Sequence, residues 1–86
     1  MKQLEKILKA LANKRRLAIL QLLKNNREEP VGEIARNIKL SFKATSKHLA
    51  ILFSADILDK DQRSLQIYYS LSKTMHPMAK QAIHLL

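Results

Sequence analysis

Three histidines, His48, His76 and His84, are the side chains with the clearest capacity to hold a metal ion, because imidazole binds zinc and nickel. Two ligands on one helix face stand four positions apart, whereas His76 and His84 stand eight apart with Pro77 between them. Neither has a carboxylate nearby in the sequence, and the chain has no cysteine. We therefore expect no metal site, no cofactor and no thiol or disulfide chemistry.

No group of residues points to catalysis. The sequence lacks a recognisable set of nucleophile, base and orienting group, and a single glycine cannot build a phosphate-binding loop. The protein is therefore not expected to be an enzyme.

Two lysines, Lys43 and Lys47, form the pattern with the most chemical meaning. They share one face of a helix predicted over residues 42–54 with Ala50 and Ser54, and that face has no acidic residue. An ordinary solvated face more often mixes glutamate with lysine. Lysines near the N-terminal end of such a helix suit an element that lies against phosphates and base edges.

Neighbouring side chains extend this candidate DNA contact. Ser41 is the predicted N-cap of the same helix, and Ser46 is the best hydroxyl candidate because Thr45 lies on the core face. Phe42 has two interpretations, which are packing in the turn, the one we favour, and contact with a thymine methyl group.

The overall charge also favours a polyanionic partner. The 86 residues include 16 lysines and arginines against 7 acidic residues, and a net charge of +9 attracts nucleic acid. A basic membrane-surface protein would concentrate this excess on one amphipathic helix, whereas here the cations run from Lys2 to Lys80. The N-terminal residues alternate apolar and charged groups, which predicts no signal peptide or membrane span and a cytoplasmic location.

Length and composition predict one small, mostly helical domain over residues 1–86. A chain of this size buries only about 60% of its unfolded surface, so an isolated monomer would be marginally stable. Hydrophobic residues make up 47% of the chain, with only one glycine and two prolines to form turns. Apolar spacing predicts a first helix at about 2–11 and a second that begins after an N-cap at Asn13 and ends at about residue 25. It also predicts a short third helix after Gly32 and a fourth helix at 42–54. A short extended strand is expected at 29–31.

Alternating apolar and polar residues over 65–71 predict a half-buried strand. It is expected to pair with residues 57–60 across a polar turn at 61–64, which makes a small β-hairpin. Side chains near the tip are candidate contacts to phosphate or the minor groove, and a solvated turn is almost as good an interpretation. These residues are Lys60, Gln62 and Arg63.

The terminal helices, at about 2–11 and 75–86, are expected to form a homodimer interface. The apolar stripe of the second helix must be buried, partly on the first helix and partly on a copy of the chain across a two-fold axis. The predicted interface residues are Leu4, Ile7, Leu8, Met75, Met78, Ala79, Ala82, Ile83 and Leu86.

The order α-α-α-α-β-β-α is that of a winged helix-turn-helix domain, and three stretches resemble the ArsR family of repressors. The stretch LKALANKRRLAILQLL resembles the family's opening signature, and EIARNIKLSFKATSKHLAILFSADIL resembles its helix-turn-helix. The stretch YYSLS resembles the end of the family's wing. The resemblance covers residues 4–72 and implies a dimer that binds imperfect palindromes in double-stranded DNA and releases them on a metal or other signal. It also aligns His48 with the family's recognition-helix histidine, which is expected to pack or to contact backbone phosphate.

The chain departs from this family at two kinds of position. Metal sensors of the family carry a Cys-x-Cys pair where this chain has Pro30, Val31 and Gly32, so a thiolate site is impossible there. Lys39 and Asp56 stand where the family usually has glycine, at turns that favour positive φ.

These observations together predict a sequence-specific DNA-binding transcriptional regulator. It is expected to be a homodimeric repressor that binds a palindromic operator through the helix at 42–54 and the hairpin wing. The alternative is a winged-helix interaction module that binds RNA, non-specific nucleic acid or a protein partner. Preference for one duplex over random DNA separates the two.

Overall fold

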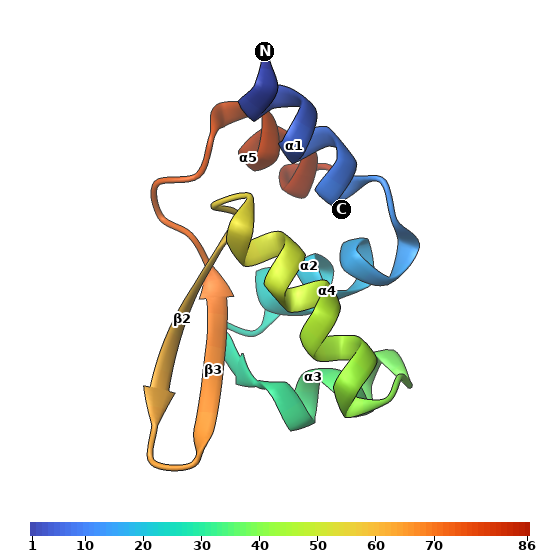
Figure 1. The fold of residues 1–86 in the computed structure, drawn as a ribbon, viewed down its shortest axis with the longest axis vertical. Helices are drawn as coiled ribbons and strands as arrows, with labels where there is room; N and C mark the ends of the chain where they lie inside the picture. Colours follow the sequence, from blue (N-terminus) through green and yellow to red (C-terminus); the bar gives the residue numbers. More distant parts are fainter.

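The computed structural model describes residues 1–86 and confirms the winged helix-turn-helix order. The elements are α1 (Lys2–Leu11), α2 (Lys14–Asn25), β1 (Glu28–Pro30), α3 (Val31–Ile38), α4 (Phe42–Ser54), β2 (Leu58–Arg63), β3 (Gln66–Leu71) and α5 (Pro77–His84). Figure 1 shows α1 and α5 together at one end of the molecule, whereas the β2–β3 hairpin and α3 occupy the other. No helix is both long and apolar enough to cross a bilayer.

Local capping fixes where α2 and α4 begin. The side chain of Asn13 accepts hydrogen bonds from the backbone N–H groups of Arg15 and Arg16, at 2.9 and 3.1 Å. The hydroxyl of Ser41 accepts one from the N–H of Ala44 at 3.1 Å. Both N-caps are as predicted, because these short polar side chains satisfy N–H groups that the first turn of a helix leaves unpaired.

Two turns adopt the left-handed backbone that the sequence suggested. Lys39 has φ of 57° and Asp56 has φ of 60°, although neither is glycine. The start of α3 differs by a small amount from the prediction, because the helix begins at Val31 rather than after Gly32. Val31 is buried, so its contact with the core favours inclusion in the helix.

The wing differs more from the prediction. The three strands form an antiparallel sheet in the order β1-β3-β2, and pairing in the hairpin continues out to Arg63 and Gln66. The connecting turn is therefore only Ser64 and Leu65, so the predicted polar turn at 61–64 is wrong. Ser64 takes φ of 57°, the left-handed conformation that tight hairpins favour. Leu65 was expected inside the strand, but it lies in this turn and is 97% exposed.

The core lies between all five helices and extends to the base of the wing. Its most completely buried members come from most of the elements and include Ile7, Ile19, Leu20, Ile34, Leu49, Leu52, Ile57 and Leu58. In β2 only Leu58 is buried, so the rest of that strand projects away from the core. The core therefore holds α4 firmly and leaves the wing tip in solvent.

Part of the expected dimer interface lies inside this core. Ile7, Ala79 and Ile83 are 1%, 0% and 5% exposed, because α1 and α5 of the same chain pack against each other. These three side chains therefore cannot offer a surface to a second chain, and that part of the prediction is corrected.

Candidate nucleic-acid interface

Helix α4 has one buried face and one basic, exposed face. Thr45, Leu49 and Leu52 are fully buried, whereas Lys43 and Lys47 are exposed on the other side. Neither lysine takes part in any of the four ion pairs of the structure. Both ammonium groups are therefore free to neutralise phosphates.

The N-terminal end of α4 adds the positive end of a helix dipole and two hydroxyl groups to this surface. Its first turn carries no acidic side chain, so the positive end of the helix dipole is not neutralised within the protein. Ser41, which caps the helix, is exposed, and Ser46 one turn further on is half-buried. Both hydroxyls lie near the N-terminal end of α4, which also carries Lys43.

Phe42, the first residue of α4, is 62% exposed. The favoured interpretation, in which its ring packs in the turn, is therefore wrong. The ring instead lines a cleft of about 290 Å³ between α4, the start of α3 and the wing, together with Ser46, Leu65 and Ile67. The packing interpretation was wrong because the exposure of this ring depends on how closely the wing approaches α4, and the two are separated here by the cleft.

His48 lies on the flank of α4 and contacts Arg16 of α2. Its Nδ1 is 3.1 Å from Nη1 of Arg16, whose Nε donates to the carbonyl of Ala10 at 2.6 Å. Burial lowers the pKa of His48, and the charges of Arg16 and Arg15 lower it further. A neutral imidazole that accepts at Nδ1 carries its proton on Nε2. His48 is half-buried at this position.

The wing cations are engaged within the protein. Both terminal nitrogens of Arg63 bind the carboxylate of Glu28, its Nε donates to Asp61 at 2.9 Å, and its guanidinium lies 4.5 Å from the ring centroid of Tyr68. The hydrogen bond from Arg63 holds the pKa of Glu28 below its ordinary value. Lys60 lies 4.4 Å above the ring centroid of Phe53. Of the three wing candidates, only Gln62 has no such partner.

The other two histidines lie away from this surface. The Nδ1 of His76 accepts a hydrogen bond from the N–H of Met78 at 3.0 Å and so caps α5. The backbone carbonyl of His84 accepts one from Lys24 at 3.1 Å. No three His, Cys, Asp or Glu side chains gather closely enough to hold a metal ion.

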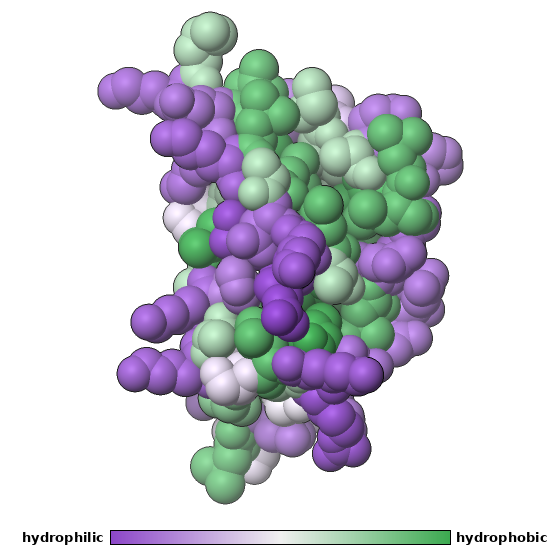
Figure 2. Space-filling view, turned by 90° about the vertical axis from the view of Figure 1, so that its right-hand side faces the viewer, coloured by the Kyte–Doolittle hydropathy of each residue, from purple (hydrophilic) through white to green (hydrophobic).

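A second exposed surface is apolar and belongs to α1 and α5. Leu8 is 47% exposed and Met78 is 41% exposed, and Figure 2 shows apolar side chains at the surface in the upper part of the molecule. Sequence reasoning missed Leu85, which is 76% exposed, because the helical period singled out Leu86. Leu86 instead packs partly against the core.

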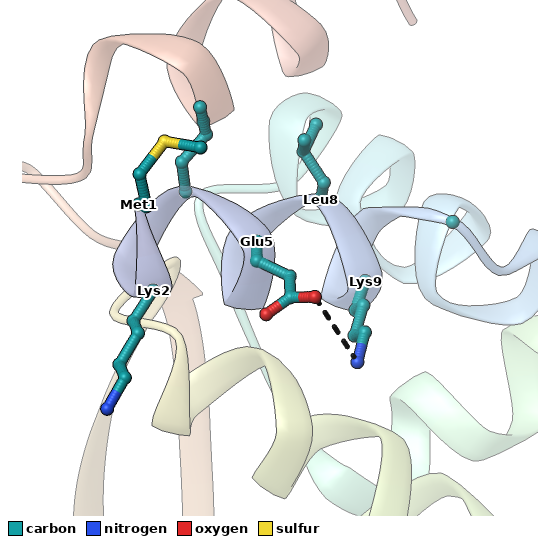
Figure 3. Close-up of a pocket in the computed structure, with 7 residues that line it drawn as sticks. Met1, Lys2, Glu5, Leu8 and Lys9 are labelled. Atoms are coloured by element: carbon teal, nitrogen blue, oxygen red, sulfur yellow. Dashed lines mark ion pairs between the residues drawn. The ribbon is translucent and has the colours of Figure 1, made fainter.

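The outer side of α1 forms a groove of about 600 Å³. Figure 3 shows Met1 and Leu8 pointing to one side of α1, and Lys2, Glu5 and Lys9 pointing to the other. Glu5 and Lys9 form an ion pair at 3.8 Å along this second side. The groove residues are Met1, Lys2, Leu4, Glu5, Leu8, Lys9 and Ala12.

The capped, basic helix α4 is the second helix of the helix-turn-helix, and the β2–β3 hairpin is the wing beside it. These features define a winged helix-turn-helix transcriptional regulator that binds DNA. The family described as bacterial regulatory protein, arsR family, matches residues 13–60 of the chain. The chain belongs to this family, as the resemblance in its sequence indicated.

Individual relatives are regulators as well. The transcriptional activator HlyU of Vibrio cholerae is 38% identical over 93% of this chain and 73% of its own, and the transcriptional repressor SdpR of Bacillus subtilis is 35% identical over 80% and 76%. The structure of reduced HlyU superimposes with a TM-score of 0.84, over 99% of this chain and 85% of HlyU, at 38% identity. A possible ArsR-family regulator from Mycobacterium bovis, described as a homodimeric winged helix-turn-helix DNA-binding domain, has a TM-score of 0.83 at 28% identity, over 98% and 74%.

Proposed function

We propose that this protein is a homodimeric, cytoplasmic repressor that binds a palindromic operator with one α4 in each half-site. The observation that carries the proposal is the acid-free face of α4, on which Lys43 and Lys47 are exposed and unpaired. In this proposal the protein acts by binding alone, without catalysis or a cofactor.

The direct contacts are assigned by exposure. Lys43 and Lys47 bind phosphates, and Ser41 and Ser46 add hydroxyl contacts at the same end of α4. In the wing, Gln62 is the free polar side chain, whereas Arg63 and Lys60 act first through their partners within the protein. His48 lies against Arg16 and positions α4.

The dimer is proposed on the exposed part of the α1 and α5 surface. Leu8 and Met78 are half-exposed apolar side chains on adjacent helices, with Leu4 at the edge of the groove and Leu85 beyond the end of α5. A two-fold axis there can hold two copies of α4 roughly 34 Å apart, which matches successive major grooves on one side of DNA. The winged helix-turn-helix domain from Mycobacterium bovis, which is described as homodimeric, supports a dimer but does not bear on which surface forms it.

The assignment as a repressor is supported by SdpR, which is named a repressor, although HlyU is named an activator. The dimer and the basic helix serve either role, because both depend on occupancy of a DNA site. A reporter gene placed behind the selected operator decides between them, since a repressor lowers expression and an activator raises it.

The test of DNA binding begins with selection of a duplex from a random pool. An operator binder prefers the selected duplex over random DNA by about a thousandfold or more. Lys43→Ala and Lys47→Ala should each weaken binding and reduce the slope of log affinity against log salt by about one unit. Lys80→Ala, an exposed lysine on α5, is the matched control and should leave the slope unchanged.

Two results would contradict this proposal. If the double lysine variant bound the selected duplex as the parent does, α4 would not be the contacting helix. If the parent bound RNA or random DNA as well as the selected duplex, the protein would be a general nucleic-acid module without an operator.

The proposal that the protein binds DNA without a metal cofactor can be tested separately. The chain has no cysteine, and no three metal-binding side chains lie together. Zinc added at micromolar concentration should therefore leave the affinity for the selected duplex unchanged. Release of DNA by zinc would show that His76 or His84 takes part in a metal site after all.

A further inference from the structure

Phe42 occupies an unusual place for a large apolar side chain. It is the first residue of α4, it is 62% exposed, and the next residue in the sequence is the exposed Lys43. The cap at Ser41 fixes the first turn of the helix, so the ring of Phe42 projects into solvent from a well-defined backbone position.

The ring also borders a cleft of about 290 Å³ between α4, the start of α3 and the wing. Ser46 lines it from α4, whereas Leu65 and Ile67 line it from the hairpin, and these two are themselves 97% and 36% exposed. The cleft is thus mainly apolar on a part of the surface that otherwise carries lysine.

The positive charge around Phe42 indicates which kind of partner binds this surface. Lys43 and Lys47 have no acidic partner, and α4 carries no acidic residue, so a polyanion is favoured over an apolar protein surface. In the major groove of DNA, the C5-methyl group of thymine is the apolar group that base pairs present. A phenyl ring at the start of a recognition helix can cover that methyl group.

We propose that Phe42 is a specificity-determining residue that packs against the methyl group of one thymine in each half-site of the operator. The proposal rests on the proposed function and names the base that α4 recognises. The aromatic ring supplies contact area with only two rotatable bonds, so little conformational freedom is lost when it binds.

The test uses the duplex selected by the parent protein. Each thymine is replaced in turn, in both half-sites, by deoxyuridine, which removes the methyl group and keeps the hydrogen-bonding edge. At one symmetric position the parent should lose affinity by about fourfold per half-site, the factor expected for one buried methyl group. Phe42→Ala should bind the thymine and uracil duplexes equally well, and Phe42→Leu should recover part of the preference.

Lys43→Ala is the control for general weakening. It should lower affinity for both duplexes by the same factor and keep the ratio between them, because a phosphate contact does not distinguish the bases. The proposal is overturned if Phe42→Ala keeps the ratio of the parent, or if no thymine position responds to loss of its methyl group. If the parent prefers no duplex over random DNA, the proposed function itself fails, and this proposal fails with it.

Discussion

The Nη1 of Arg16 lies 3.1 Å from the Nδ1 of His48, and this contact joins the start of α2 to the middle of α4. The same guanidinium donates to the carbonyls of Ala10 and Lys9, at 2.6 and 3.1 Å. These carbonyls belong to the last turn of α1, where no further helical N–H is available to them. Arg16 therefore links α1, which carries the proposed dimer surface, to α4, which carries the proposed DNA surface.

Replacement of Arg16 should destabilise the protein. Arg16→Ala removes two charged hydrogen bonds to backbone carbonyls and is expected to lower the free energy of unfolding by about 2 kcal/mol. Arg16→Lys should recover little, because a single ammonium cannot reach three acceptors in a fork. Arg36→Ala is the control, since its ion pair with Glu33 is 3.7 Å long and its side chain is 79% exposed. Urea unfolding measures all three, and equal stability of Arg16→Ala and the parent would contradict the linking role.

His48 should make stability depend on pH. Its pKa in the folded protein lies below the ordinary value of 6.5, because burial and the charges of Arg16 and Arg15 disfavour the imidazolium. The unfolded chain therefore binds more protons than the folded one below about pH 6.5, so the contribution is complete above that pH and is lost as the pH falls.

Unfolding at pH values between 5 and 8 tests this for the parent and His48→Gln, which cannot titrate there. The stability of the parent relative to the variant should decrease as the pH is lowered. All other side chains are common to both proteins, so their contributions cancel in the comparison. A difference that stays constant with pH would contradict the prediction.

Thr45 carries a buried hydroxyl that has no hydrogen-bond partner, although the residue is fully buried in the face of α4 that packs on the core. Thr45→Val keeps the shape and removes the unpaired group, so the free energy of unfolding should rise by about 1–2 kcal/mol. The control is Thr74→Val, because the hydroxyl of Thr74 lies 3.4 Å from that of Ser72 and should gain nothing on removal. Thermal unfolding of both variants measures the effect, and a less stable Thr45→Val would contradict it.

Local signals in the sequence predicted the recognition helix well. The cap at Ser41, the buried face with Thr45 and the exposed Lys43 and Lys47 all depend on neighbours within one or two helical turns. The exposure of Phe42 could not be predicted in this way, because it depends on how closely the wing approaches α4.

In the wing, too, contacts between residues far apart in the sequence could not be predicted from local patterns. Residues 61–64 are polar throughout and suggested a turn, yet Asp61, Gln62 and Arg63 form strand because pairing with β3 continues to Arg63. Arg63 was predicted as a candidate contact to phosphate or the minor groove, and its ion pair with Glu28 could not be predicted, because Glu28 is 35 positions away in the sequence. At the other end, Ile7 and Ile83 appeared as an interface stripe because a helical period cannot tell a core contact from a contact with a second chain.

Lys39 and Asp56 offer a test of backbone strain. Both adopt positive φ, which costs a side chain with a Cβ roughly 1–2 kcal/mol. Lys39→Gly should raise the free energy of unfolding by about 1 kcal/mol, because relief of strain exceeds the added flexibility of the unfolded chain. Asp56→Gly should gain less, since aspartate tolerates this conformation better. Urea unfolding ranks the two, and a larger gain at Asp56 would contradict the argument.

The last prediction separates the dimer surface from the core beneath it. Leu8 is 47% exposed on α1, so Leu8→Glu should leave the protomer folded and place an unpaired charge in the proposed interface. Such a burial costs a few kcal/mol, enough to give monomers at micromolar concentration. Ile83→Glu should unfold the protomer instead, because Ile83 is 5% exposed.

Leu65→Glu is the matched control, since Leu65 is a still more exposed leucine in the turn between β2 and β3. Figure 1 shows that turn and α1 at opposite ends of the molecule. Size exclusion with light scattering gives the mass, and circular dichroism confirms that each variant is folded. The parent and Leu65→Glu should be dimers and Leu8→Glu a folded monomer. That monomer should also lose most of its affinity for the palindrome, because each α4 then binds its half-site alone. A dimeric Leu8→Glu, or a monomeric parent that binds the palindrome tightly, would place the dimer elsewhere or remove it from the mechanism.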